Sequence, residues 1–359
     1  MHRIYNFSAG PATLPVEVLE QAQAELLDYQ GLGMSIMEDS HRAAAYDQVH
    51  TEALENMREL LGVSDDYAVL FLTGGATGQF AMVPLNLLGP GAVADYAHSG
   101  AWAEKAIQEA RIIGRVEVVA DCGDEIPTRV PDPAELKQTP GAAYLHITSN
   151  ETISGAQWKT FPESEAPLVA DMSSDILSRP IDVSRFGLIY AGAQKNIGPA
   201  GVTLVIIRKD LAERVPDTVP LFYRYATHLK ANSLYNTPPC FAVYLTLLVT
   251  RWLKAKGGVA AMEKINERKA AILYDLIDAG GFYRGTALPA CRSTMNVTFR
   301  LPSEELEKTF VKEATANGFS GLKGHRSVGG IRASIYNAMP EAGVAALAHF
   351  MREFESRQG

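Results

Sequence analysis

Residues 191–201 read AGAQKNIGPAG, a segment in which Lys195 stands among small residues and between two apolar runs. Glycine and alanine let the backbone and a ligand approach closely, and a lysine held in a partly desolvated turn loses its proton more readily. A neutral lysine amine is a nucleophile that condenses with carbonyl groups. A glycine-rich turn with a solvated lysine has the same composition, so this segment alone leaves both interpretations open.

Asp171 directly follows the apolar run 168–170, which predicts a buried strand. The carboxyl ends of parallel strands are where α/β folds bind their ligands. An aspartate there suits a partner for the pyridine nitrogen of pyridoxal phosphate, which it keeps protonated. The alternative is a helix N-cap before Met172. Because Asp171 and Lys195 follow consecutive predicted strands, we favour the catalytic interpretation for both.

Residues 73–78, TGGATG, join a predicted strand to a predicted helix. Backbone amides at a helix N-terminus with glycines nearby suit a bound phosphate, although a plain tight turn is at least as common. The segment lacks the GxGxxG and GK[ST] patterns, so it indicates neither a dinucleotide nor a nucleoside triphosphate. Trp102 lies in the next strand-to-helix connection, where its indole can stack on a flat ring or simply pack.

Three cationic elements complete the candidate residues: His41 with Arg42, His325 with Arg326, and Arg332. Arginine binds carboxylate and phosphate groups through two hydrogen bonds, so several such groups suit a substrate with more than one anionic group. Most arginines are solvated surface residues, which is the alternative for each. Arg332 is the strongest candidate because it interrupts an apolar strand.

Short apolar runs alternate with helical stretches over the first two thirds of the chain. The pattern predicts strands at 69–72, 92–94, 116–119, 143–147, 168–170, 188–190 and 202–207, and helices at 80–88 and 103–111. This alternation is typical of a parallel sheet covered by helices. The stretch between the last two strands is too short for a crossover helix, so we expect that pair to be antiparallel.

The last third of the chain predicts a smaller α+β domain. A helical region at 241–277 leads into strands at 295–299 and 331–335 and amphipathic helices at 304–317 and 341–356. A single core rarely grows beyond ~250 residues, and this chain has 359. We therefore expect a large domain at 16–256 and a small domain formed by 1–15 and 257–359.

Composition narrows the class of protein. The net charge of −8 predicts no affinity for nucleic acid. Cys122, Cys240 and Cys291 are far apart and form no CxxC pair, so we expect neither a metal site nor disulfides, and a reducing cytoplasm fits best. The first residues lack an apolar targeting region, and no apolar run approaches the ~20 residues of a membrane span.

Taken together, these motifs resemble the phosphoserine aminotransferase family, within the fold-type I, class V pyridoxal-phosphate enzymes. The segments that carry the resemblance are 6–12 (NFSAGPA), 31–35 (GLGMS), 38–42 (EDSHR), 150–152 (NET), 178–183 (SRPIDV), 191–201, 235–239 (YNTPP), 323–326 (KGHR) and 331–337 (IRASIYN). They run from end to end of the chain. The resemblance implies an α/β fold with a mainly parallel seven-stranded sheet in the large domain, and a smaller α+β C-terminal domain.

The resemblance also implies roles around the cofactor. Lys195 would carry pyridoxal phosphate, Asp171 would pair with its pyridine nitrogen, Trp102 would stack on its ring and Thr152 would bind its 3′-oxygen. The residues implied for the cofactor phosphate are Ala76, Thr77 and Gln194, joined by Asn236 and Thr237 of the neighbouring subunit of a homodimer. Some relatives carry Gly-Arg where this chain has Ala76-Thr77, so here backbone amides would bind the phosphate.

For the substrate, the resemblance implies that Arg332 holds the α-carboxylate. His41 and Arg42 would bind the distal phosphate or carboxylate, with His325 and Arg326 closing the same pocket, across the subunit interface. The implied reaction is reversible transamination between phosphoserine and 2-oxoglutarate, giving 3-phosphohydroxypyruvate and glutamate, in serine and possibly pyridoxine biosynthesis. The alternatives are a small-substrate transaminase, a cysteine desulfurase or a non-catalytic pyridoxal-phosphate-binding module.

Overall fold

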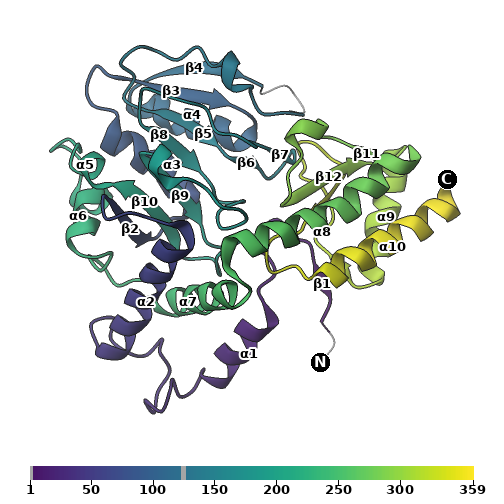
Figure 1. Cartoon of the computed structure of the whole chain (residues 1–359), viewed down its shortest axis with the longest axis horizontal. Coiled ribbons are helices and arrows are strands. Elements are labelled where there is room, and N and C mark those ends of the chain that lie inside the picture. Colours follow the sequence, from purple (N-terminus) through teal and green to yellow (C-terminus); the bar gives the residue numbers. More distant parts are fainter. Residues whose placement is uncertain (1–2, 123–126) are drawn as a thin grey trace.

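The computed structural model describes residues 3–122 and 127–359, and its central layer is a seven-stranded sheet (Figure 1). The strands, in their order across the sheet, are β2 (Tyr67–Leu72), β10 (Thr203–Arg208), β9 (Leu188–Gly192), β8 (Leu168–Asp171), β5 (Leu145–Thr148), β3 (Val93–His98) and β4 (Arg115–Asp121). All neighbours are parallel except β10, which is antiparallel to both β2 and β9. The predicted parallel sheet and the predicted antiparallel pair are both confirmed.

Helices cover both faces of this sheet. On one face lie α2 (Ala44–Leu61) and α7 (Cys240–Ala255), and on the other lie α3 (Gly75–Leu87) and α4 (Ala101–Ile113). Successive side chains of a strand point to opposite faces. In β10, Leu204 and Ile206 accordingly share a core with α2 and α7, while Val205 and Ile207 share a core with α3 and α4. Burial on both faces explains why the strands are continuous apolar runs.

The C-terminal part of the chain forms a separate layer, seen to the right in Figure 1. Its elements are α8 (Gly258–Gly280), β11 (Arg284–Gly285), β12 (Asn296–Arg300), α9 (Glu304–Ala316), β13 (Phe319–Ser320), β14 (Ile331–Ser334) and α10 (Glu341–Gln358). A three-stranded sheet has the order β11-β12-β14. The N-terminal strand β1 (Tyr5–Asn6) pairs with β13, and Phe7 belongs to the apolar core of this layer.

The predicted helical region at 241–277 is two helices rather than one. They are separated at Lys256 and Gly257, and Gly257 has φ +93°, a backbone conformation that a helix does not contain. Helices α1 (Val16–Ala24) and α2 were not predicted from the sequence. The remaining short elements are β6 (Asn150–Glu151), β7 (Ala156–Gln157), α5 (Lys209–Ala212) and α6 (Tyr225–Lys230). No helix in the described ranges is both long and apolar enough to span a membrane.

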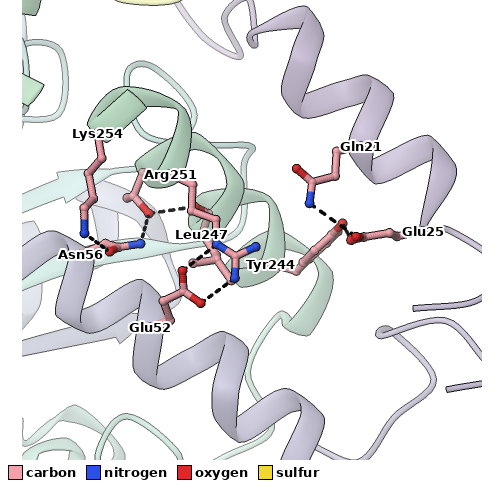
Figure 2. Close-up of polar contacts among 9 residues, drawn as sticks. Gln21, Glu25, Glu52, Asn56, Tyr244, Leu247, Arg251 and Lys254 are labelled. Atoms are coloured by element: carbon pink, nitrogen blue, oxygen red, sulfur yellow. Dashed lines mark hydrogen bonds and ion pairs between the residues drawn. The ribbon is translucent and has the colours of Figure 1, made fainter. Parts of the chain in front are cut away.

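Polar contacts hold α1, α2 and α7 together (Figure 2). The Arg251 guanidinium donates to both carboxylate oxygens of Glu52, at 2.6 and 2.5 Å, so α7 is joined to α2 by a bidentate ion pair. The Tyr244 hydroxyl of α7 donates to Glu25 at the end of α1. These contacts anchor the helices on either side of the segment between α1 and α2, which carries His41 and Arg42.

Candidate active site

Lys195 lies in the turn that follows β9, half-buried. Its Nζ donates a hydrogen bond to the Thr152 hydroxyl at 2.7 Å. Burial lowers the pKa of Lys195 to about 8, against a smaller opposing effect of Asp171 and Glu151. Gly10, with φ +148°, packs on this lysine, since a Cβ there would stand 3.2 Å from Lys195 Cγ. The amine is thus closely surrounded, and a larger share of it is neutral at physiological pH than for an ordinary lysine.

Asp171 is the last residue of β8 and is 5% exposed. Burial raises the pKa of its carboxyl group, and the positive charge of Lys195 opposes that shift. One carboxylate oxygen accepts a hydrogen bond from the backbone N–H of Ser173 at 2.9 Å. Residues 173–177 form a turn and no helix follows directly, so Asp171 does not cap a helix. It is an acid with a local hydrogen bond, held at the same sheet edge as Lys195.

The segment predicted to form a phosphate cup joins β2 to α3. Gly74 and Gly75 have φ +92° and +64°, values that L-residues with side chains rarely adopt, and α3 begins at Gly75. Ala76 and Thr77 therefore lie in the first turn, where backbone N–H groups have no partner within the helix. Gln194, near Lys195, folds its side chain over Gly192.

Trp102 and Arg332 approach the lysine from two different layers. Trp102 lies in the first turn of α4, with its ring centroid 5.4 Å from Lys195 Nζ. Arg332 projects from β14 and donates to the backbone carbonyl of Thr152 at 3.4 Å. Burial lowers the pKa of Arg332, whose Nε has no hydrogen-bond partner among the described residues. A half-buried guanidinium without an acid partner is suited to bind a carboxylate.

His325 and Arg326 lie beside Arg332. Burial lowers the pKa of His325, and the nearby positive charges of Arg332, Arg326 and Lys105 lower it further. The His325 ring also contacts the Ser327 hydroxyl at 2.7 Å. This side of the site therefore concentrates positive charge, as expected for a pocket that receives an anionic group.

Four of the predicted site residues make no hydrogen bond or ion pair to Lys195 or its neighbours in the site, within the part of the chain that the structure describes. Arg42 is exposed, and its guanidinium makes no hydrogen bond or ion pair within 3–122 and 127–359. Neither His41 nor Thr237 has a hydrogen bond or ion pair to the lysine, and Asn236 donates only to the Thr237 carbonyl at 3.1 Å. The cluster in a single chain consists of Lys195, Asp171, Thr152, Trp102 and Arg332.

The sequence analysis gave no role to Glu151, which it named only as part of the segment 150–152 (NET). It is 1% exposed, and burial raises its pKa to about 7. Its carboxylate accepts hydrogen bonds from the Ser99 hydroxyl and from the backbone N–H groups of Trp102 and Ala103. The available signal was its position, since a charged residue stands directly before Thr152 and shortly after the predicted strand at 143–147.

Comparison with known proteins identifies the family of the chain. A family model described as aminotransferase class-V matches residues 4–347. The chain belongs to the class V aminotransferase family. It is 58% identical to a phosphoserine aminotransferase of Geobacillus kaustophilus, over 99% of each chain. It is also similar to the solved structure of a phosphoserine aminotransferase from Bacillus circulans subsp. alkalophilus, with a TM-score of 0.98, 54% identity and 99% of each chain covered.

This class V aminotransferase is pyridoxal-phosphate-dependent. A pyridoxal-phosphate-bound phosphoserine aminotransferase from Trichomonas vaginalis is 41% identical to it, with a TM-score of 0.94 over 98% of this chain and 100% of that one. The residues present fit the cofactor. A half-buried lysine with lowered pKa would hold the cofactor aldehyde, a buried carboxylate would pair with a protonated ring nitrogen, and the N-terminus of α3 would receive a phosphate.

Proposed function

We propose that the chain is a phosphoserine aminotransferase, which interconverts O-phospho-L-serine and 2-oxoglutarate with 3-phosphohydroxypyruvate and L-glutamate. The observation that carries this proposal is the Arg332 guanidinium, which lies near the Lys195 amine and has no carboxylate partner among the described residues. The chain also matches phosphoserine aminotransferases over nearly its whole length. All four substrates carry an α-carboxylate and a second anionic group. Arg332 suits the first, and the cationic surroundings of His325 suit the second.

The residues of the chain divide the work of the reaction. Bound pyridoxal phosphate supplies an electron-withdrawing ring that stabilises negative charge at the substrate Cα. Lys195 would hold the cofactor and would move the proton that the substrate Cα releases. Asp171 would keep the ring nitrogen protonated, and the Thr152 hydroxyl would orient both the lysine and the ring. Arg332 fixes the α-carboxylate, so that the Cα–H bond is presented to Lys195.

We propose further that two copies of the chain form a homodimer with shared sites. His41, Arg42, Asn236 and Thr237 would act in the site of the neighbouring subunit, which agrees with their lack of contacts to Lys195 in their own chain. Large apolar side chains are exposed near these residues: Leu27 at 85%, Leu32, Met37, Leu221, Phe222, Tyr223 and Tyr235. An exposed apolar surface of this kind is typical of a subunit interface.

Two other assignments are part of the same proposal. Residues 16–256 form the large cofactor-binding domain, and residues 1–15 with 257–359 form the small domain, supported by the core that Phe7 shares with the C-terminal layer. Among the described residues Cys240 and Cys291 form no disulfide, which supports a reducing cytoplasm. A desulfurase is disfavoured, because Cys291 lies in a turn at Pro289–Cys291, packed against a core cluster.

The proposal is tested by a half-reaction titration of the purified enzyme. The absorbance of the bound cofactor is followed as phosphoserine, serine, alanine and cysteine are added separately. Phosphoserine should convert the cofactor to its aminated form with an efficiency at least about 100-fold above that of serine or alanine, because a cationic pocket left unpaired disfavours substrates without the distal anion. Conversion by alanine or cysteine as efficient as that by phosphoserine would contradict the assignment.

A further inference from the structure

Helix α4 begins without a cap of its own. The residue at its N-cap position is Gly100, which has no side chain to accept a hydrogen bond from the first turn. N-cap side chains usually accept from the second or third backbone N–H of the helix, here those of Trp102 and Ala103. Both N–H groups instead donate to Glu151, each at 3.4 Å, with Trp102 bonded to Oε2 and Ala103 to Oε1. The cap of α4 is thus supplied by a residue some fifty positions further along the chain.

The fit between Glu151 and the start of α4 is tight. A Cβ on Gly100 would stand 2.8 Å from Glu151 Cδ, so the carboxyl group occupies the space that an N-cap side chain would need. The Ser99 hydroxyl donates to Oε1 at 3.0 Å, which adds a third hydrogen bond to the same carboxylate. The close contact and the three hydrogen bonds therefore hold the Glu151 side chain in a defined position against the N-terminus of α4.

This position couples two groups of the active site. Glu151 and Thr152 are adjacent in the chain, and they bind different partners. Glu151 holds the backbone of Trp102, while Thr152 accepts the hydrogen bond from Lys195 Nζ. The pair lies in the short hairpin of β6 and β7, which follows β5 directly in the chain. The indole of Trp102 is in this way placed against the lysine amine.

We propose that Glu151 is a positioning residue: by capping α4 from outside the helix, it sets Trp102 over Lys195 and so sets the orientation of the cofactor ring. The inference rests on the proposed function only in that pyridoxal phosphate is bound, whichever amino acid is the substrate. Glu151 could also affect catalysis in a second way, through its negative charge, which raises the pKa of the nearby Lys195. The test must separate the two.

The decisive variant is Glu151→Gln, which keeps the shape of the side chain. Its single carbonyl oxygen serves one backbone N–H, and its NH2 group faces the other, so one capping hydrogen bond is lost. We expect kcat/KM to fall roughly tenfold and the induced circular dichroism of the bound cofactor to weaken, because the ring loses its fixed orientation. The dichroism readout needs no substrate, so it tests the inference even if phosphoserine proves to be the wrong amino donor.

Two further variants make the result specific. Ser303 caps α9, a helix of the same 13-residue length as α4, through the Leu306 N–H, so Ser303→Ala is a matched loss of a helix cap elsewhere. It should lower the melting temperature without changing the dichroism or kcat/KM. In a Trp102→Ala background, Glu151→Gln should have less than about twofold further effect on either readout, since the group through which it acts is gone.

The proposal fails on either of two results. Unchanged dichroism and kcat/KM in Glu151→Gln would show that Glu151 contributes at most to the stability of the fold and does not position Trp102 for catalysis. An undiminished effect in the Trp102→Ala background would show that Glu151 acts through its charge on Lys195 and not through Trp102.

Discussion

At the scale of single residues, the chemistry depends on how far burial shifts the pKa values of the ionisable side chains in the site. The same desolvation that lowers the pKa of Lys195 to about 8 raises the pKa values of Asp171 and Glu151, because each charged form loses hydration. The charges also interact favourably, since Asp171 and Glu151 oppose the shift of the lysine. Lys195 keeps enough neutral amine to act as a nucleophile, beside an acid that can stay ionised when it meets a positive ring.

The shifted pKa of Lys195 predicts unusual reactivity of the cofactor-free protein. A lysine with its ordinary pKa near 10.5 is almost entirely protonated at pH 8, whereas about half of the Lys195 amines are neutral there. Labelling by an amine-reactive reagent, read by mass spectrometry, should show a midpoint near pH 8 at Lys195. An exposed lysine such as Lys308 serves as the control. A midpoint for Lys195 above pH 10 would show that its surroundings do not destabilise the charge.

Asp171→Asn should impair catalysis much more than cofactor binding. The amide preserves the shape of the buried side chain but removes the charge that keeps the pyridine nitrogen protonated. We expect kcat to fall at least about tenfold, which corresponds to about 1.4 kcal/mol of transition-state stabilisation, while the purified variant still contains pyridoxal phosphate. Cofactor content and kcat are measured on the same preparation. Near-normal turnover would assign Asp171 to the turn at Ser173 alone.

At the scale of elements, the sequence predicted the strands and helices that have a clear apolar pattern, and it did not predict the shortest strands. The strands of the main sheet are continuous apolar runs, and β8 and β9 were placed well enough to bring Asp171 and Lys195 to one edge. The hairpin β6–β7 has only two residues in each strand, too few to show a period, and so the role of Glu151 could not be derived. The break at Gly257 was also missed, because the apolar helical pattern continues on both sides of it.

One buried lysine ties α8 to the end of β14. Lys269 is fully buried and donates to the backbone carbonyls of Ile335, Tyr336 and Met339, at 2.9, 2.8 and 3.1 Å. Nearby, the Asn337 N–H donates to the side chain of Asn196, the neighbour of Lys195. Lys269 therefore helps to shape the loop after β14, which packs against the turn that carries Lys195.

Burial lowers the pKa of Lys269 to about 7, which makes stability depend on pH. Between about pH 7 and pH 10.5 the unfolded chain holds a proton on this lysine that the folded chain has released, so the free energy of unfolding rises with pH through this window. Lys269→Met removes this contribution. Denaturant unfolding from pH 6.5 to pH 9.5 should show the stability of wild type increasing relative to the variant. A constant difference across that range would contradict the shifted pKa.

At the scale of the whole molecule, one chain supplies only part of the predicted site. Arg332 of the C-terminal layer lies close to Thr152 and Lys195. Sequence spacing cannot show which of the remaining residues act across an interface. The exposed apolar residues 221–223 and the solvated Arg42 suggest that these parts are completed by a second copy.

Mixing two inactive variants tests whether the sites are shared. Lys195→Ala lacks the nucleophile, and Arg42→Ala lacks the group proposed to bind the distal anion from the neighbouring subunit. If Arg42 acts across the interface, a heterodimer of the two variants has one site with both defects and one site with neither. Random exchange of equal amounts makes about half of the dimers mixed, so about a quarter of all sites become intact.

Activity with phosphoserine should then recover to about a quarter of the wild-type value after unfolding and refolding the mixture, while each variant refolded alone stays inactive. If Arg42 instead serves the site of its own chain, every site in a mixed dimer carries one defect, and no activity returns. The subunits must exchange for either result to count, so mixed dimers are also isolated by two different affinity tags, and these should show about half of the wild-type activity, because one of their two sites is intact. An inactive mixed dimer would place Arg42 in its own subunit's site and remove the main reason for proposing that the sites are shared.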